Sequence, residues 1–466
     1  MPRPFAPLFL SGFALLATSS RMFGQTPQLA PFTVDDAVRL ATRDNPRVIA
    51  AARDVESAAS GVRSARAWTN PNVFFAPGIT SVSGTGEEFL FQQPLEINGT
   101  RRARTGIAQA GLRATEARST VSVRDVVFSA KTAYYELARA REQAVVFAEA
   151  LTVAREFDRI ARRQVEEGAR PGIDLAQTGL EVSRAQRQVI LADAQSVATL
   201  AALNTALGRD PANPVGALTP LSALFESLSP KGGGDTPLPA VPPPVSPTAA
   251  PSNASAPQSA TGATDQSTTA LLKGAATTRG EVLAGRATGE QFRQEARLAR
   301  AEGRPDLVPQ FRVGYFLRGL QPASQGQGAG IGIALTLPIF DYGSRRNRVR
   351  QAEQAALAQD ARVVALQNEI RQQVTQAVAR QRAAESVAQA YAGGTLEQAQ
   401  RLLDASRIGF REGRTSVVAL LEAQRSFRAV QSEYINALAD VAIARAEVER
   451  ATGAVSPAIL AERKKP

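Results

Sequence analysis

The sequence of 466 residues contains no cysteine and no histidine. These absences exclude disulfide bonds, thiol nucleophiles, lipid-anchored cysteine, Cys/His metal sites and imidazole acid–base catalysis. Aspartate and glutamate could still act as catalysts or metal ligands, but no clustered acidic pair lies outside the predicted helix faces. We therefore expect no enzymatic activity, no bound cofactor and no metal site.

Long apolar runs are also scarce, because no segment after the N-terminal region reaches the ~18 apolar residues of a membrane-spanning helix. At the N-terminus, Arg3 precedes an apolar stretch over residues 5–17, and small and polar residues follow. This pattern resembles a secretory signal peptide over residues 1–24, with a disordered tail as the alternative. An exported chain without a spanning helix is either soluble or a β-barrel.

Basic residues outnumber acidic residues by 54 to 43, which gives a net charge of +11. Such an excess favours anionic surroundings such as nucleic acid or lipid headgroups. However, the chain has no dense Lys/Arg tract with interleaved aromatic residues. Its basic residues mostly alternate with Glu, Gln and Ala, which predicts solvated helix faces and no nucleic-acid partner.

The two halves of the chain repeat one another. The segment GTRR at residues 99–102 recurs as GSRR at 343–346, Glu167-Gly168 recurs as Glu412-Gly413, and Gly208 recurs as Gly453. These offsets of 244 and 245 residues predict one supersecondary unit used twice, over residues 32–220 and 276–455. Residues 221–275, rich in Pro, Ala and Ser, are predicted to be a disordered linker, and residues 456–466 a tail.

Each repeat contains a predicted β-hairpin, at residues 72–93 and 310–337. Side chains on a strand alternate between two faces, and these strands approach the ~9–11 residues that cross a bilayer when tilted. The residues predicted to face the membrane are Phe89, Phe91, Phe311, Tyr315, Ile331, Ile333 and Leu335, whereas Arg312 and Arg318 are predicted to face a barrel lumen. An ordinary half-buried hairpin remains the alternative.

Each hairpin is followed by a long coiled-coil hairpin, at residues 101–208 and 344–453. Large residues recur every seventh position at Leu420, Phe427, Tyr434, Val441 and Val448, and mostly alanine follows three residues later. This is an a/d seam, and subtracting 245 preserves its register in the first repeat. Because four strands per chain cannot close a barrel and open edges are not tolerated in lipid, several chains must share one barrel.

The order of these elements resembles the TolC-like outer-membrane efflux family. The resemblance rests on the motif Pro-x-x-x-x-Gly-x-Arg-Arg between hairpin and helix, at Pro94, Gly99, Arg101 and Arg102 and again at Pro338, Gly343, Arg345 and Arg346. It implies a mainly α-helical homotrimer with a shared membrane β-barrel in the outer membrane and an α-helical tunnel through the periplasm. It also implies a passive exit duct for efflux or type I secretion, opened by a periplasmic adaptor protein and an inner-membrane pump.

The resemblance also suggests roles for individual residues. The helical hairpin tips would contact the adaptor through Glu167, Gly168, Gly172, Glu412, Gly413 and Thr415. Asp174 and Glu422 are candidates for acidic residues at the closed periplasmic aperture, or are ordinary acids near helix starts, favoured by the helix dipole.

Two further alternatives follow from the residues. The arginines after each hairpin, at positions 101, 102 and 104 and at 345, 346 and 348, would bind lipid headgroup or lipopolysaccharide phosphates, or would be solvated helix starts. A soluble periplasmic coiled-coil scaffold or adaptor protein is the alternative for the whole chain, and it would not need two copies of a membrane-type hairpin.

Overall fold

The computed structural model describes residues 31–77, 85–169, 171–228, 261–317, 328–336 and 340–453. The predicted signal peptide, most of the linker and the C-terminal tail lie outside these ranges. The first repeat begins with α1 (Val34–Asp44) and α2 (Pro46–Arg66), continues with β1 (Asn72–Pro77) and β2 (Thr85–Gln92), and ends with α3 (Thr100–Glu166) and α4 (Gly172–Leu207).

The second repeat has the same order. It consists of α6 (Thr261–Thr278), α7 (Gly280–Ala301), β3 (Asp306–Leu317), β4 (Gly328–Thr336), α8 (Ser344–Ala390), the π-helical kink η1 (Tyr391–Thr395), α9 (Leu396–Arg411) and α10 (Val417–Thr452). A short helix, α5 (Leu221–Leu228), follows the first repeat.

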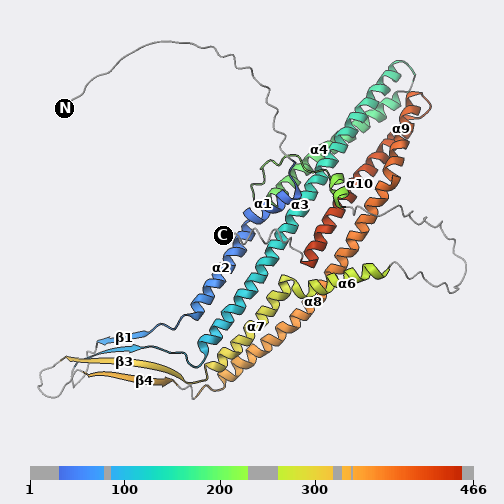
Figure 1. Ribbon diagram of the computed structural model, residues 1–466. Helices are drawn as coiled ribbons and strands as arrows, with labels where there is room; N and C mark the ends of the chain where they lie inside the picture. Colours follow the sequence, from blue (N-terminus) through green and yellow to red (C-terminus); the bar gives the residue numbers. More distant parts are fainter. Residues whose placement is uncertain are drawn as a thin grey trace, which may run out of the picture.

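The chain is elongated, with its strands at one end and the tips of the helical hairpins at the other (Figure 1). The strands form a four-stranded antiparallel sheet in the order β1-β2-β3-β4. The helices that precede and follow the strands pack side by side, α2 on α3, α3 on α7 and α7 on α8. Both predicted β-hairpins and both predicted helical hairpins are therefore present.

Glycines with positive φ mark corresponding points of the two repeats. They precede the long helices (Gly99 and Gly343), lie at the hairpin tips (Gly168 and Gly413) and end the return helices (Gly208 and Gly453). A Cβ at Gly208 would lie 2.8 Å from Cα of Asn45, where α1 meets α2. The left-handed backbone and this close approach both require glycine, which explains why the sequence repeats it.

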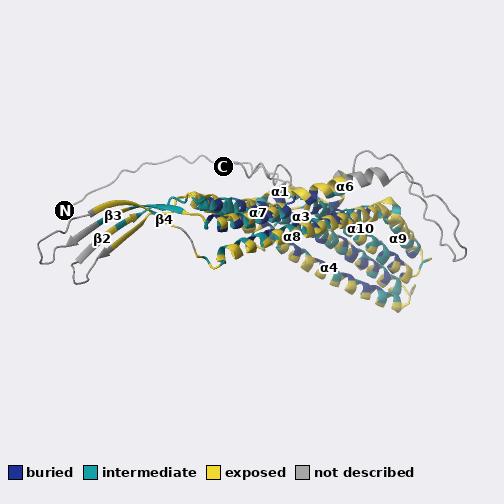
Figure 2. Cartoon of the chain, turned by 90° about the horizontal axis from the view of Figure 1, so that it is seen from below, coloured by how far each residue is buried: buried dark blue, intermediate teal, exposed yellow. Residues whose placement is uncertain are grey.

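Most of the described core lies between the helices, whereas the sheet is largely exposed within one chain (Figure 2). The predicted seam is buried as expected at Leu420, Ala423, Ala437 and Val441. Tyr134 in α3 is fully buried, and its hydroxyl donates a hydrogen bond of 2.9 Å to the carbonyl of Phe32. Alanine-rich seams let these helices approach closely, so the core is long and thin.

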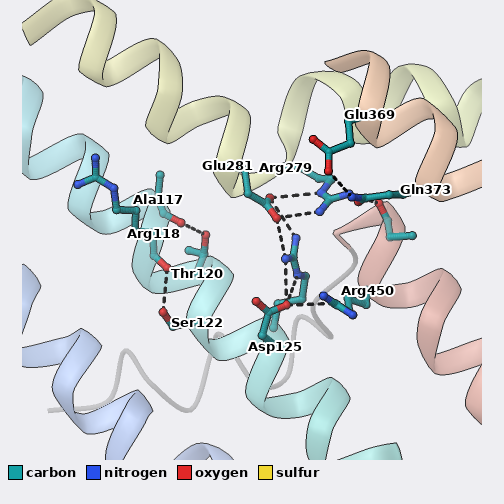
Figure 3. A network of polar contacts seen from close by, with 12 residues as sticks. Ala117, Arg118, Thr120, Ser122, Asp125, Arg279, Glu281, Glu369, Gln373 and Arg450 are labelled. Atoms are coloured by element: carbon teal, nitrogen blue, oxygen red, sulfur yellow. Dashed lines mark hydrogen bonds and ion pairs between the residues drawn. The ribbon is translucent and has the colours of Figure 1, made fainter. Parts of the chain in front are cut away.

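An ion-pair network links α3, α7, α8 and α10 at the middle of the molecule (Figure 3). The Glu281 carboxylate accepts hydrogen bonds of 2.7 Å from both Arg124 and Arg279. Arg279 also donates to Gln373 at 2.9 Å and to the carbonyl of Ala451 at 3.2 Å. Burial alone would raise the pKa of Glu281, but the two guanidinium groups outweigh burial and lower it to about 2.

The structure differs from the sequence prediction at both ends of the expected linker. Residues 221–228 and 261–278 are helical, and each helix buries apolar side chains against the neighbouring helices. Leu221 of α5 is 1% exposed, and its backbone N–H donates to Glu142. Ala275 of α6 joins a cluster with Val282, and both side chains are buried. The middle of the expected linker lies outside the described residues.

One helix of the described ranges, α4, has the length and mean hydropathy that would suffice to cross a membrane. Apolar residues between its polar ones raise the mean, although no uninterrupted apolar run of that length exists. Such a single match is weak evidence, since a coiled-coil helix passes the same test. α4 packs along α3 as half of a helical hairpin.

Replacing Glu281 with Gln is expected to lower the free energy of unfolding by about 3 kcal/mol. The substitution leaves Arg124 and Arg279 buried without their shared counter-charge, and this is the costly way to break a buried ion pair. Circular dichroism at 222 nm during heating measures the change. Glu369→Gln, at an exposed neighbour that contacts Gln373, is the matched control and should melt like the unmodified protein.

The lowered pKa of Glu281 also predicts that the stability of the protein depends on pH. Because folding lowers the pKa of Glu281 from 4.5 to about 2, its contribution to stability is present above pH 4.5 and is lost as the pH falls toward 2. Melting temperatures between pH 5 and pH 2 should therefore fall less steeply for Glu281→Gln than for the unmodified protein. Parallel curves would contradict this role.

Candidate functional site

One face of the sheet carries rows of apolar side chains that cross all four strands. Val73, Phe91, Phe311 and Ile331 lie directly opposite one another in the register. Their exposed fractions run from 36% for Phe91 to 88% for Ile331. Directly paired residues of an antiparallel sheet share a face. The predicted membrane-facing residues Phe91, Phe311 and Ile331 are thus brought together on one face.

The remaining predicted membrane-facing residues fit the same register. Phe89 lies opposite Val313, Ile333 opposite Pro309 and Leu335 opposite Leu307. Phe89, Ile333 and Leu335 are exposed. Tyr315 lies in β3 opposite the backbone of Glu87.

The opposite face of the sheet carries Arg312, which lies opposite Leu90 on one side and Gly330 on the other. Its neighbours along β3 alternate away from it, so Arg312 and Phe311 lie on different faces. A division between lumen and membrane would require such a separation, and the assignment of each face stays a prediction. Arg318, the other predicted lumen residue, lies outside the described residues.

Two arginines stabilise the turn from strand to helix in the first repeat. The Arg101 guanidinium lies 3.8 Å from the centre of the Trp68 ring, which is a cation–π contact. Arg104 pairs with Glu96 at 2.7 Å and donates to the carbonyls of Ala65 and Ala67 at the end of α2. Beyond Pro94, the N–H of Leu95 donates to Leu307, so the sheet continues into the turn.

The turn of the second repeat is more open. Gly343 precedes α8 with φ of 83°, as Gly99 precedes α3 with φ of 90°. Arg345 lies 3.6 Å from Asp341, and the Arg346 side chain is exposed. Pro338 of the predicted motif lies outside the described residues.

The hairpin tips are short turns at the far end of the molecule (Figure 1). Glu167 is followed by Gly168 in the left-handed conformation, and α4 begins at the exposed Gly172. In the second repeat, Glu412 pairs with Arg414, and Gly413 is left-handed.

The structure assigns the cap of α10 to Ser416, whose hydroxyl accepts a hydrogen bond of 3.2 Å from the N–H of Ala419. Thr415 instead packs against Gly409, and its N–H donates to the carbonyl of that residue. All six predicted tip residues therefore lie at the two turns.

The two predicted aperture acids lie near these tips, and Glu422 belongs to an ion-pair cluster. Glu422 is 3.7 Å from Arg425, which also donates to Glu181 of α4 at 2.7 Å. The Glu181 side chain is only 4% exposed and lies 3.9 Å from Arg428 as well. Asp174 lies in the first turn of α4.

Sequence reasoning missed the contact between Glu181 and Arg425. The pair joins α4 of the first hairpin to α10 of the second. An apolar cluster formed by Phe157 of α3 with Leu403, Phe410 and Leu420 also joins the hairpins. At the offset of 245 residues that relates the two hairpins, Glu181 corresponds to Ser426 and Arg425 to Leu180, so the repeat gave no signal for the ion pair.

No group of three or more acidic residues able to hold a metal ion occurs within the described residues. What the described chain presents is therefore an exposed strand face at one end and joined helical tips at the other.

The model of the outer membrane efflux protein family matches residues 37–209 and 271–454. The cobalt-zinc-cadmium resistance protein CzcC of Cupriavidus metallidurans is 24% identical over 464 residues, covering 97% of this chain and 99% of CzcC. The nickel-cobalt-cadmium resistance protein NccC of Alcaligenes xylosoxydans is 28% identical, but the match spans only about half of each chain, 51% and 54%.

Among solved structures, the outer membrane protein VceC from Vibrio cholerae has the same fold, with a TM-score of 0.67 and 17% identity. That match covers 90% of this chain and 96% of VceC. The two regions that match the family model together make up most of the chain. The protein therefore belongs to the outer membrane efflux protein family, as a trimeric outer-membrane channel that extends into the periplasm and works with a periplasmic adaptor protein and an inner-membrane pump.

Proposed function

We propose that this channel exports divalent metal cations. The observation that carries the proposal is the match to CzcC, a cobalt-zinc-cadmium resistance protein, over nearly the whole length of both chains. NccC, a nickel-cobalt-cadmium resistance protein, adds support over half of the chain. Neither cysteine nor histidine occurs in the sequence, so the strongest ligands for transition metals are absent and cations pass along the duct without being held.

The channel is a passive conduit with no catalytic step. Its strands enter the outer membrane, with the row of Val73, Phe91, Phe311 and Ile331 facing lipid and Arg312 facing the lumen. Support comes from the register, which places these apolar residues on one exposed face. The energy for export comes from the inner-membrane pump.

The periplasmic aperture opens by movement of the second helical hairpin relative to the first. α3 is a single helix of 67 residues, whereas its counterpart is interrupted by η1 after 47 residues of α8. Gly394 within η1 has φ of 128°, which side chains rarely tolerate. These features support a hinge at η1, with the tip of the second hairpin swinging beyond it.

The ion pair between Glu181 and Arg425 holds this hairpin in place. It bridges the two hairpins on the tip side of η1, and Glu181 is almost fully buried. The tip residues Glu167, Gly168, Gly172, Glu412, Gly413 and Thr415 contact the adaptor, and Asp174 and Glu422 contribute negative charge near the aperture. Docking of the adaptor provides the free energy that breaks the contacts between hairpins.

Loss of the gene is expected to lower tolerance to nickel, cobalt, zinc and cadmium salts several-fold. The measurement is the minimal inhibitory concentration in the native host, with the gene restored on a plasmid as the control. Unchanged tolerance to all four cations, together with reduced tolerance to organic compounds, would show that the cargo is wrong while the channel remains correct.

The variant Glu181→Gln is expected to open more readily. A hydrogen bond between charged groups contributes about 1.5–3 kcal/mol, so its weakening shifts the closed-to-open equilibrium about tenfold. Single-channel recordings of the trimer in planar bilayers measure the open probability. Glu397→Gln is the matched control, since that carboxylate pairs only with Arg401 within α9 among the described residues. Equal open probabilities in both variants would exclude Glu181 as a latch.

A further inference from the structure

A pocket of about 510 Å³ lies between the end of α7 and the start of α8, and its lining is strongly basic. Four arginines contribute to it, Arg300 from α7 and Arg345, Arg346 and Arg350 from α8, together with Glu353. Gly303 also lines the pocket. A Cβ there would overlap the Arg345 guanidinium.

The pocket holds more positive charge than its own acids balance. Arg300 pairs with Glu353, and Arg345 lies 3.6 Å from Asp341. The side chains of Arg346 and Arg350 are exposed and make no ion pair or hydrogen bond with any described residue. Two guanidinium groups therefore remain available in each chain, and this surplus suits a phosphate group, which arginine binds with paired N–H donors.

The equivalent place in the first repeat is packed differently. Arg101, the counterpart of Arg345, is engaged with the Trp68 ring. The counterpart of Arg350 is Gly106, where a Cβ would come within 2.7 Å of the Gln294 side chain, so α7 packs tightly against α3. One copy of the duplicated unit is thus closed by packing, and the other is open and charged.

The surroundings of the pocket match the interface of a membrane. Arg345 to Glu353 occupy the first turns of α8, within roughly 15 Å of its start at 1.5 Å per residue. Phe340 and Tyr342, in the turn that joins β4 to α8, are 83% and 99% exposed. Exposed aromatic residues beside basic ones are typical of the headgroup layer, where rings reach the acyl boundary and cations meet phosphates.

We infer that this pocket binds the phosphate of an anionic lipid headgroup in the periplasmic leaflet of the outer membrane, with Arg346 and Arg350 as its ligands and Phe340 and Tyr342 against the acyl chains. The inference rests on the outer-membrane location of the channel. Each trimer offers three such sites at the level where strands give way to helices, and bound lipid anchors the second repeat of each chain at that level.

Native mass spectrometry of the delipidated full-length trimer in detergent tests the inference. Phosphatidylglycerol, phosphatidylethanolamine and inorganic phosphate are titrated separately. The expected result is up to three phosphatidylglycerol molecules per trimer, bound more tightly than phosphatidylethanolamine. Because two arginines near an anionic lipid surface together change binding by more than tenfold, Arg346→Gln/Arg350→Gln should weaken phosphatidylglycerol binding by about that factor.

The control is Arg63→Gln/Arg66→Gln, which removes two exposed arginines from the last turn of α2 in the first repeat and should leave binding unchanged. Equal weakening by both double variants would overturn the pocket in favour of diffuse charge. Saturation by inorganic phosphate without preference for the lipid would overturn the lipid assignment. The same spectra report the trimer mass, so failure to form the trimer would count against the channel itself and would be distinguishable from loss of lipid.

Discussion

The unpaired edges of the four-stranded sheet govern the assembly of this protein. β1 and β4 each have a neighbour on one side only within the chain. Within a bilayer no water satisfies an open row of N–H and C=O groups, so each edge must pair with the edge of another chain. Closing the sheet in this way also brings the helices below it into a ring. The tunnel through the periplasm is thus a consequence of the pairing that the membrane demands.

The chain contains two similar units, and the second differs from the first in structural features that our proposals use. In the first unit α3 runs unbroken for 67 residues, and Trp68 packs against Arg101 near its start. The second unit has a kink at η1 and an open basic pocket beside Gly303. The buried Glu281 joins the units, since it pairs with Arg124 of the first and Arg279 of the second. The proposed hinge and the proposed lipid site therefore both lie in the second unit.

Much of this arrangement follows from local patterns in the sequence. Alternation along residues 310–317 identifies a strand, and spacing by sevens from Leu420 to Val448 identifies a seam, because both report on one element at a time. The repeated glycines identify turns because φ near 75–90° admits few other residues. Family resemblance then supplied the tips and the number of chains.

Contacts between distant segments could not be derived in this way. Glu181 and Arg425 are separated by 244 residues, and each alone is an ordinary charge on a helix. The Glu281 network likewise joins helices whose mutual packing no local pattern specifies. α5 and α6 were missed for a different reason: a low-complexity composition concealed short segments whose few apolar residues pack on neighbouring helices.

The uninterrupted length of α3 sets the distance between the strands and the hairpin tips. At 1.5 Å per residue, its 67 residues span about 100 Å between the strand end and the hairpin tip. The returning helices and the second unit are packed alongside in register, so no single helix can change length alone. A gain or loss of one residue would rotate every seam position beyond it by about 100°. The distance that this protein bridges can therefore change in evolution only when whole heptads are gained or lost at matching places in both units.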